Sequence, residues 1–149
     1  MRILIAAVVM VLFFSGCNHQ PSFSNIILPT YDNISNKERR LFKRFSEYWH
    51  YRLIKDFDRT YSYELPYQRY LIDKSTYKGL LDGYGEDTKV QLLKITFLSP
   101  DVAIIQRKII TKANTLTGKD KWIYVNGEWY HKFFQNILPP KNKEEAEFQ

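Results

Sequence analysis

The chain has 149 residues, of which 44% are hydrophobic, 16% aromatic and 26% charged. This length and composition are enough for one ordinary globular domain and too little for two. The formal net charge of +6 is a moderate excess of Lys and Arg. It lacks the concentrated basic character of nucleic-acid-binding domains, so nucleic acid is not an expected partner.

Residues 1–16 have the pattern of a signal peptide. One positive charge at Arg2 precedes an apolar run from Ile3 to Phe14, which is followed by the small residues Ser15 and Gly16. The run is shorter than the roughly 20 residues that a helix needs to cross a bilayer. We therefore expect cleavage after Gly16.

The only cysteine, Cys17, directly follows the small residues. The stretch Phe14-Ser15-Gly16-Cys17 resembles the lipobox of bacterial lipoproteins. The resemblance implies a diacylglyceryl thioether on Cys17 and a further acyl chain, such as palmitate, on its amino group. Since each buried methylene contributes about 0.8 kcal/mol, two or more chains give stable attachment to a membrane. The alternative interpretation of a lone cysteine is a buried, inert thiol.

Position 18 bears on the location in the cell. By resemblance to enteric lipoproteins, an aspartate there favours retention in the inner membrane, whereas this chain has Asn18. We expect the bacterial cell envelope, with the protein lipid-anchored to the outer membrane and facing the periplasm. Residues 17–36 are rich in Pro, Asn and Ser and are predicted to be the lipidated cysteine and a flexible tether.

A long amphipathic helix is predicted to begin after Ser35. Ser35 and Glu38 have the spacing of a capping box, in which each side chain accepts a hydrogen bond from a free backbone N–H. Aromatic and aliphatic residues then recur every three or four positions, and among them Phe45 and Trp49 are predicted to be buried against a sheet. Asp56 or Asp58 is expected to cap a short second helix that ends before Pro66.

A further small helix is predicted around residues 75–83, with Ser75 as its N-cap and Gly83 as its stop. The pattern then changes to alternating β-branched and aromatic residues at 89–98, 101–112, 120–125 and 128–134. Residues 113–119 are expected to connect two of these strands. The fold class is therefore predicted to be α+β, with N-terminal helices packed on a curved antiparallel sheet.

Asn126-Gly127 is the dipeptide best suited to a two-residue hairpin turn. Such a turn places Tyr124 opposite Trp129 and Trp122 opposite His131. Because cross-strand partners share a face, these four aromatic rings are predicted to face the long helix. His131 is accordingly expected to be a neutral or hydrogen-bonded residue at the inner margin, in preference to a catalytic base.

Three segments resemble the nuclear transport factor 2-like superfamily, which includes SnoaL-like domains. They are the aromatic-rich helix with its acidic turn and Tyr-containing second helix (residues 45–69), the small helix at 77–81, and the Trp-hairpin-Trp ending at 120–133. The resemblance implies a cone in which a curved sheet wraps the long helix. The predicted organisation is a cone-like domain over residues 37–138 and a charged, disordered tail at 139–149. Such folds host enzymes and binding proteins alike.

An acid-base enzyme on such a cone needs a carboxylate and a hydrogen-bond donor that converge in an apolar cavity. The candidate carboxylates are Asp56, Asp58, Glu64 and Asp73. The alternative interpretations are helix caps and, for Glu64, an ion pair with Arg69. Eight of the eleven tyrosines lie between residues 48 and 84, where they suit either a pocket mouth or the margin of an ordinary core. The residues expected at a pocket or interface are Tyr63, Tyr67, Arg69 and Tyr77.

The stretch KERRLFKR places five cations within eight residues: Lys37, Arg39, Arg40, Lys43 and Arg44. They are candidates for binding anionic lipid head groups or an acidic partner. The alternative is that they solvate the outer face of the helix. No metal site and no cofactor are expected, since the histidines are isolated in the sequence and no phosphate-binding loop is present.

Two functions follow from these observations. The first is a membrane-anchored envelope lipoprotein that acts as a non-catalytic binding or assembly module for an envelope protein. The alternative is a small cone-fold acid-base enzyme, similar to isomerases and dehydratases, that uses a pocket carboxylate and a tyrosine. A carboxylate in a dry, open cavity favours the enzyme, and a solidly packed interior favours the binding module.

Overall fold

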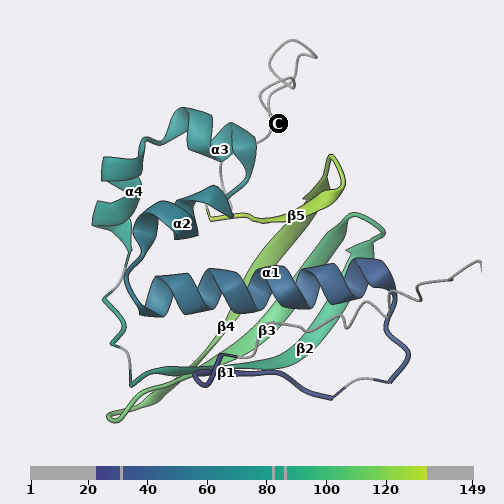
Figure 1. Ribbon diagram of the computed structural model, residues 1–149, viewed down its shortest axis with the longest axis horizontal. Helices are drawn as coiled ribbons and strands as arrows, with labels where there is room; N and C mark the ends of the chain where they lie inside the picture. The colour runs from purple at the N-terminus through teal and green to yellow at the C-terminus, as the bar shows by residue number, and fades with distance from the viewer. Residues whose placement is uncertain (1–22, 31, 82, 86, 134–149) are drawn as a thin grey trace, which may run out of the picture.

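The computed structural model describes residues 23–30, 32–81, 83–85 and 87–133 (Figure 1). The predicted signal peptide, the lipidation site Cys17 and the charged tail at 139–149 lie outside the described residues. The described chain forms four helices, α1 (Asn36–Leu53), α2 (Phe57–Ser62), α3 (Pro66–Leu71) and α4 (Lys74–Leu80). Its strands are β1 (Ile26–Ile27), β2 (Lys89–Ser99), β3 (Val102–Ile110), β4 (Thr115–Val125) and β5 (Glu128–His131).

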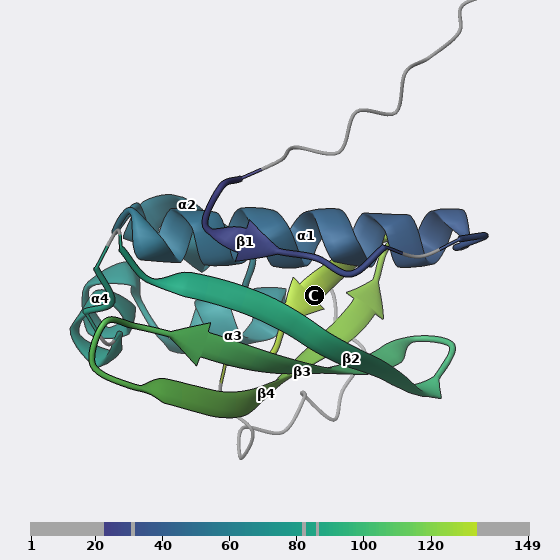
Figure 2. The same cartoon turned by 90° about the horizontal axis from the view of Figure 1, so that it is seen from below.

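The five strands form one curled sheet in the order β1-β2-β3-β4-β5. The contacts from β2 to β5 are antiparallel, and β1 pairs with β2 in parallel. Helix α1 lies across the concave side of the sheet, and the three short helices gather at one end of α1 (Figures 1 and 2). The predicted α+β class, with helices on a curved sheet, is therefore confirmed.

The start of α1 and its buried face agree with the sequence pattern. Ser35 Oγ accepts from the N–H of Glu38, whose carboxylate accepts from the N–H of Ser35, so the capping box is present. Phe45 and Trp49 are fully buried in the core between α1 and the sheet. Buried aromatic side chains of this size each remove 150–250 Å² from water, roughly, which makes them the main contributors to the core.

The β4–β5 hairpin has the predicted register. Tyr124 pairs with Trp129, and Trp122 pairs with His131. Asn126 and Gly127 both have positive φ, as a two-residue turn of this kind requires. Trp122 and Trp129 are fully buried on the side of the sheet that faces α1.

The segment predicted as a flexible tether is ordered sooner than expected. Ile26 and Ile27 pair with Val90 and Gln91, and the N–H of Val90 donates to the carbonyl of Asn25 at 2.9 Å. The prediction of a tether up to residue 36 is wrong at this strand, which also makes the sheet mixed instead of purely antiparallel. A two-residue strand is too short to show an alternating pattern, so its flanking Pro, Asn and Ser residues dominate the local sequence.

Three other elements, β4, α3 and α4, differ from the prediction. Strand β4 begins at Thr115, within the stretch predicted as a connection, because Thr115 to Lys119 continue the antiparallel pairing with β3. Helix α3 was not predicted; it begins at Pro66, a residue that suits the first turn of a helix because it lacks an N–H. The N-cap of α4 is Asp73 instead of Ser75, and α4 ends at Leu80, before Gly83.

Candidate functional site

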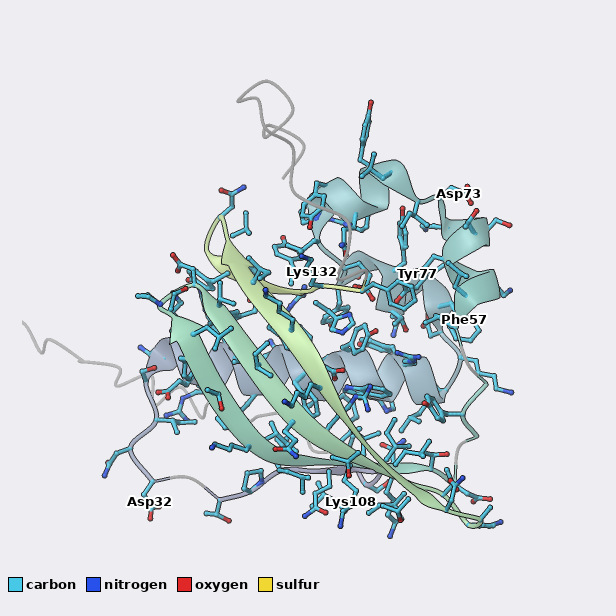
Figure 3. The ribbon with its side chains drawn as sticks, turned by 180° about the vertical axis from the view of Figure 1, so that it is seen from behind. Asp32, Phe57, Asp73, Tyr77, Lys108 and Lys132 are labelled. Carbon is cyan, nitrogen blue, oxygen red and sulfur yellow. The ribbon has the colours of Figure 1, made fainter. Side chains whose placement is uncertain are left out.

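Six polar or partly polar side chains meet inside the domain, between α1, the helical end and the last three strands of the sheet. We call them the polar cluster, and they are Trp49, Glu64, Tyr77, Arg107, Asp120 and His131. Figure 3 shows Tyr77 pointing from α4 toward the sheet. The cluster contains two carboxylates that are almost completely buried, which is the arrangement that most needs a physical explanation.

Backbone hydrogen bonds bring Glu64 and His131 together although 67 positions separate them. Glu64 lies between α2 and α3, and its segment forms an isolated parallel bridge with the end of β5. The N–H of Leu65 donates to the carbonyl of His131 at 3.0 Å, and the N–H of His131 donates to the carbonyl of Tyr63 at 2.8 Å. The two side chains are therefore held at a short distance by the fold itself.

Both oxygens of Glu64 are used within the protein. Oε1 accepts from the hydroxyl of Tyr77 at 2.6 Å, and Oε2 lies 2.8 Å from Nδ1 of His131. The Glu64 side chain is 2% exposed and that of His131 is 7% exposed. Glu64 has no ion pair with Arg69 among the described contacts, so the predicted Glu64–Arg69 pair is wrong.

The second carboxylate, Asp120, lies on the inner face of β4 and is also fully engaged. Trp49 Nε1 donates to Oδ2 at 2.9 Å, and Arg107 Nε lies 2.9 and 3.0 Å from the two oxygens. Nε2 of His131 is 3.9 Å from Oδ1, so the imidazole stands between the two carboxylates. Buried charges of this kind are tolerated because each one has a partner of opposite charge and further hydrogen bonds.

Gly118 makes room for Arg107. The two residues pair across β3 and β4, and a Cβ at position 118 would lie 2.5 Å from Nη1 of Arg107. A side chain there would push the guanidinium away from Asp120. The Gly in an otherwise ordinary strand is thus explained by the close approach of a neighbouring side chain.

The electrostatics of the polar cluster favour a protonated His131. Burial alone lowers the pKa of the imidazole, but the charge of Glu64 and the contacts with both carboxylates raise it to about 9. Burial raises the pKa of Asp120, and its contacts with His131, Arg107 and Trp49 outweigh that effect and lower it. The expectation that His131 is hydrogen-bonded is confirmed by its contact with Glu64, and the raised pKa favours the protonated form of the ring over the neutral one.

The stability of the domain is expected to fall above neutral pH. Because the pKa of His131 is raised from 6.5 to about 9 on folding, its contribution is fully present below pH 6.5 and is lost as the pH rises through 9. That contribution is about 3 kcal/mol, since each pKa unit corresponds to about 1.4 kcal/mol. Asp120 has a lowered pKa, so its contribution to the stability of the domain is lost only when the pH falls into the acid range. Urea denaturation between pH 6 and pH 10 measures this.

A matched variant identifies the source of the pH effect. His131→Gln removes the titrating group and keeps a hydrogen-bond donor. The free energy of unfolding of the variant is expected to be lower than that of the wild type and to depend much less on pH between 6 and 10. If the variant kept the slope of the wild type, another group would be responsible and the interpretation of His131 would be wrong.

The polar cluster is closed, and its two carboxylates are already used within the protein. A general base needs a free lone pair directed at a substrate proton. Here both carboxylates already accept hydrogen bonds on both oxygens, and each side chain is less than 5% exposed. The two described pockets are lined by other residues: one of about 250 Å³ lies beside Arg39 and one of about 330 Å³ beside Phe57.

Three of the four residues predicted at a pocket or interface, Tyr63, Tyr67 and Tyr77, are buried. Tyr77 belongs to the polar cluster, and Tyr63 donates instead to Glu47 at 2.9 Å. Burial raises the pKa of both phenols, and burial also raises the pKa of Tyr67. Tyr67 is buried and Arg69 is half-buried. The tyrosines therefore belong to the core and its margin.

The other candidate carboxylates have local roles. Asp56 caps α2 by accepting from the N–H of Arg59 at 3.1 Å, and Asp73 caps α4 by accepting from the N–H of Thr76 at 2.9 Å. Asp58 forms an exposed ion pair with Lys74 at 3.0 Å. None of the three contacts the polar cluster.

Two of the five predicted cationic residues of α1 donate hydrogen bonds to the β4–β5 hairpin, and two others form ion pairs within the protein. Arg40 donates to the carbonyl of Gly127 at 2.7 Å, and Arg44 donates to that of Trp129 at 2.8 Å. Lys37 pairs with Asp101 at 2.7 Å, and exposed Lys43 lies 3.9 Å from Glu47. Half-buried Arg39 lines the smaller pocket. This surface is less available for an outside partner than its sequence suggests.

Sequence reasoning missed Asp120, Arg107 and Trp49 as partners in one cluster. One signal was present: in the alternating strand, Asp120 has the same parity as Trp122, so it shares the inward face predicted for that tryptophan. An acidic residue on an inward face requires a buried donor or cation. The identity of that cation depends on pairing between strands, which a single sequence does not display.

No protein-family model matches this chain, and no curated protein matches it. Among the described residues, no group of three or more His, Cys, Asp and Glu side chains is arranged to hold a metal ion. No helix within the described part of the chain is long and apolar enough to cross a membrane.

Proposed function

We propose that this protein is a bacterial envelope lipoprotein, anchored through Cys17, whose domain is a non-catalytic binding or assembly module. The proposal includes the outer membrane as its site and membership of the nuclear transport factor 2-like superfamily. The lipobox-like stretch before Cys17 supports the anchor. The curled sheet around α1 supports the family.

The proposal of a non-catalytic domain is supported by the hydrogen bonding of the two buried carboxylates. Glu64 and Asp120 are the residues that an acid-base mechanism would use, and every one of their oxygens has a protein partner. Freeing one of them for a substrate would leave a buried cation, His131 or Arg107, without its counter-charge, which is strongly destabilising. A module that binds through its surface makes no such demand.

The convergence of Glu64, Tyr77 and His131 is the one feature that favours the alternative, a cone-fold acid-base enzyme. A carboxylate, a phenol and an imidazole within hydrogen-bonding distance are the groups that such chemistry uses. Their full intramolecular pairing and burial weigh against it. The test is the double variant Glu64→Gln/His131→Gln, which removes both buried charges together and is compared at a temperature where it is folded: an enzyme loses its reaction, and a binding module keeps its partner.

The anchor is tested by expressing the full chain in bacteria with radiolabelled palmitate. The wild type is expected to incorporate label and to sediment with membranes, because acyl chains on Cys17 supply the attachment. Cys17→Ser is expected to take up no label and either to appear in the soluble fraction or to accumulate as an uncleaved precursor.

The control is Ser15→Ala, which keeps a small residue before the cysteine and is expected to behave like the wild type. A Cys17→Ser protein that is cleaved, unlabelled and still fully membrane-bound would contradict the lipid anchor. Unlabelled wild type would contradict it as well.

A further inference from the structure

The outer face of the sheet, opposite α1, carries a set of lysines. In β3 the buried residues Ala103, Ile105 and Ile109 point toward α1, so the alternate positions point outward. The residues of β2 and β4 that pair with these outward positions of β3 point outward as well. We call the following residues the lysine face: Lys89 and Lys94 on β2, Lys108 on β3, and Lys119 and Lys121 on β4. Figure 3 views the sheet from this side and labels Lys108.

The described part of the chain does not neutralise the lysine face. Among the described residues, no carboxylate lies within 4.0 Å of any of its five ammonium groups. None of the outward positions of β2, β3 and β4 is Asp or Glu. Glu128 on β5 is an outward carboxylate, and it accepts from the N–H of Trp129.

The charges in this region repel one another. The N–H of Lys132 donates to the carbonyl of Lys121 at 2.8 Å, so Lys132, which directly follows β5, lies beside Lys121 of β4. Burial, and then the charge of Lys121, lower the pKa of Lys132. Like charges placed opposite each other destabilise a sheet. The five residues of the lysine face, which have no carboxylate partner among the described residues, are therefore suited to an acidic partner from outside the protein.

The lysines are spread out instead of converging. Lys94 and Lys119 both pair with Gln106, from opposite sides, which puts them about 10 Å apart at the usual strand spacing. Lys121 follows two residues after Lys119, about 7 Å further along the strand. No single small anion reaches all of them. Half-buried Ile104 and Ile123 lie between them on the same face.

We propose that the lysine face is a docking surface for an acidic protein surface, so that this domain binds an envelope protein by charge complementarity. The inference rests on the proposed function and names the partner's chemistry. Spaced cations with apolar residues between them suit an extended, mixed protein interface, in which complementary charges steer association and set the register.

The position of the predicted anchor favours a protein over the anchoring membrane. β1, which follows Cys17 by nine residues, lies beside α1, whereas the outer face of β3 and β4 lies on the other side of the molecule (Figure 2). Nine extended residues reach about 30 Å at most. With the predicted anchor on this short tether, we expect the side of α1 and β1 to face the bilayer and the lysine face to point away from it.

The test uses the full chain, purified in neutral detergent, with poly-L-glutamate of about 50 residues as the acidic probe. Fluorescence anisotropy measures binding. Lys94→Gln/Lys119→Gln/Lys121→Gln is expected to weaken binding about tenfold, since each exposed ion pair contributes only modestly. The matched control, Lys55→Gln/Lys74→Gln/Lys78→Gln, removes the same charge from exposed lysines near α2 and α4 and is expected to change binding less than twofold.

Carbodiimide cross-linking to the same probe, followed by peptide mass spectrometry, locates the contacts. Amide bonds are expected at Lys94, Lys119 and Lys121 and not at Lys74 or Lys78. Equal weakening by both triple variants, or cross-links distributed over all exposed lysines, would overturn the proposal. The palmitate experiment above is independent, so failure of the anchor and failure of the lysine face are distinguishable.

A second arm tests a membrane as the occupant. The full chain is placed in nanodiscs of phosphatidylglycerol or of phosphatidylcholine, and lysine acetylation is compared. The proposal expects Lys94, Lys119 and Lys121 to be acetylated equally in both. Protection of these lysines from acetylation only in phosphatidylglycerol would overturn the proposal and identify the lipid as the occupant. A DNA duplex that binds more tightly than polyglutamate and cross-links to the same lysines would overturn it in favour of nucleic acid.

Discussion

Replacing Trp129 by alanine is expected to lower the free energy of unfolding by about 3–5 kcal/mol, as truncation of a buried aromatic side chain does. Trp129 is fully buried, and its indole N–H donates to the carbonyl of Lys37 at 3.0 Å. Its ring also packs on Tyr124 and Phe97. The variant therefore loses the contact between the hairpin and the start of α1. A loss of this size is a large part of the stability of a small domain.

Chemical denaturation of wild type, Trp129→Phe and Trp129→Ala measures this effect. Trp129→Phe is expected to lose less, because the phenyl ring fills part of the space. Tyr130→Ala is the matched control, since Tyr130 is the next residue of β5 and is only half-buried on the outer face. If Trp129→Ala kept the melting temperature of the wild type but lost a partner, the hairpin would be a binding surface and not part of the core.

Replacing Glu64 by alanine is expected to cost about 3–5 kcal/mol as well, for an electrostatic reason. Removing one member of a buried ion pair leaves the other charge uncompensated. In Glu64→Ala, the imidazolium of His131 loses its closest partner at 2.8 Å and Tyr77 loses its acceptor. The pKa of His131 is then expected to fall, and NMR titration of the imidazole measures that fall alongside the loss of stability.

An exposed ion pair is the matched control. Lys37 and Asp101 lie 2.7 Å apart, but the Asp101 side chain is 63% exposed, so Asp101→Ala is expected to cost less than about 1 kcal/mol. The double variant Glu64→Gln/His131→Gln is expected to be more stable than the sum of the single losses predicts, because the two residues interact directly. Strict additivity, or a stable Glu64→Ala protein, would show that the polar cluster does not hold the domain together.

The features that could be predicted from the sequence are the local ones. The capping box at Ser35 and the apolar stripe after it predict α1, because both depend on spacings of three and four residues. The Asn126-Gly127 turn predicts the β4–β5 register, because a two-residue loop leaves only one pairing. From that register the inward position of Trp122 and Trp129 follows by alternation alone.

The features that could not be predicted depend on contacts between distant segments. Ile26 and Ile27 become a strand only because the edge of β2 is nearby. Glu64 meets His131 through backbone bonds between the α2–α3 segment and β5, and no local pattern encodes that bridge. In the sequence Glu64 is five residues from Arg69, which is why an ion pair between them was the simpler expectation. The cations of α1 likewise gain their hairpin partners only in the folded domain.

Exchange of the imidazole C2 hydrogen measures most directly whether the polar cluster is closed and structural. The full chain is incubated in deuterated buffer over a range of pH, and the rate at each histidine is read by mass spectrometry. We expect His131 to exchange far more slowly than half-buried His50, with a titration midpoint above 6.5, because its ring is almost inaccessible and protonated. Exchange at His131 as fast as in a free imidazole would place the ring in an open, solvent-filled site and would contradict the account.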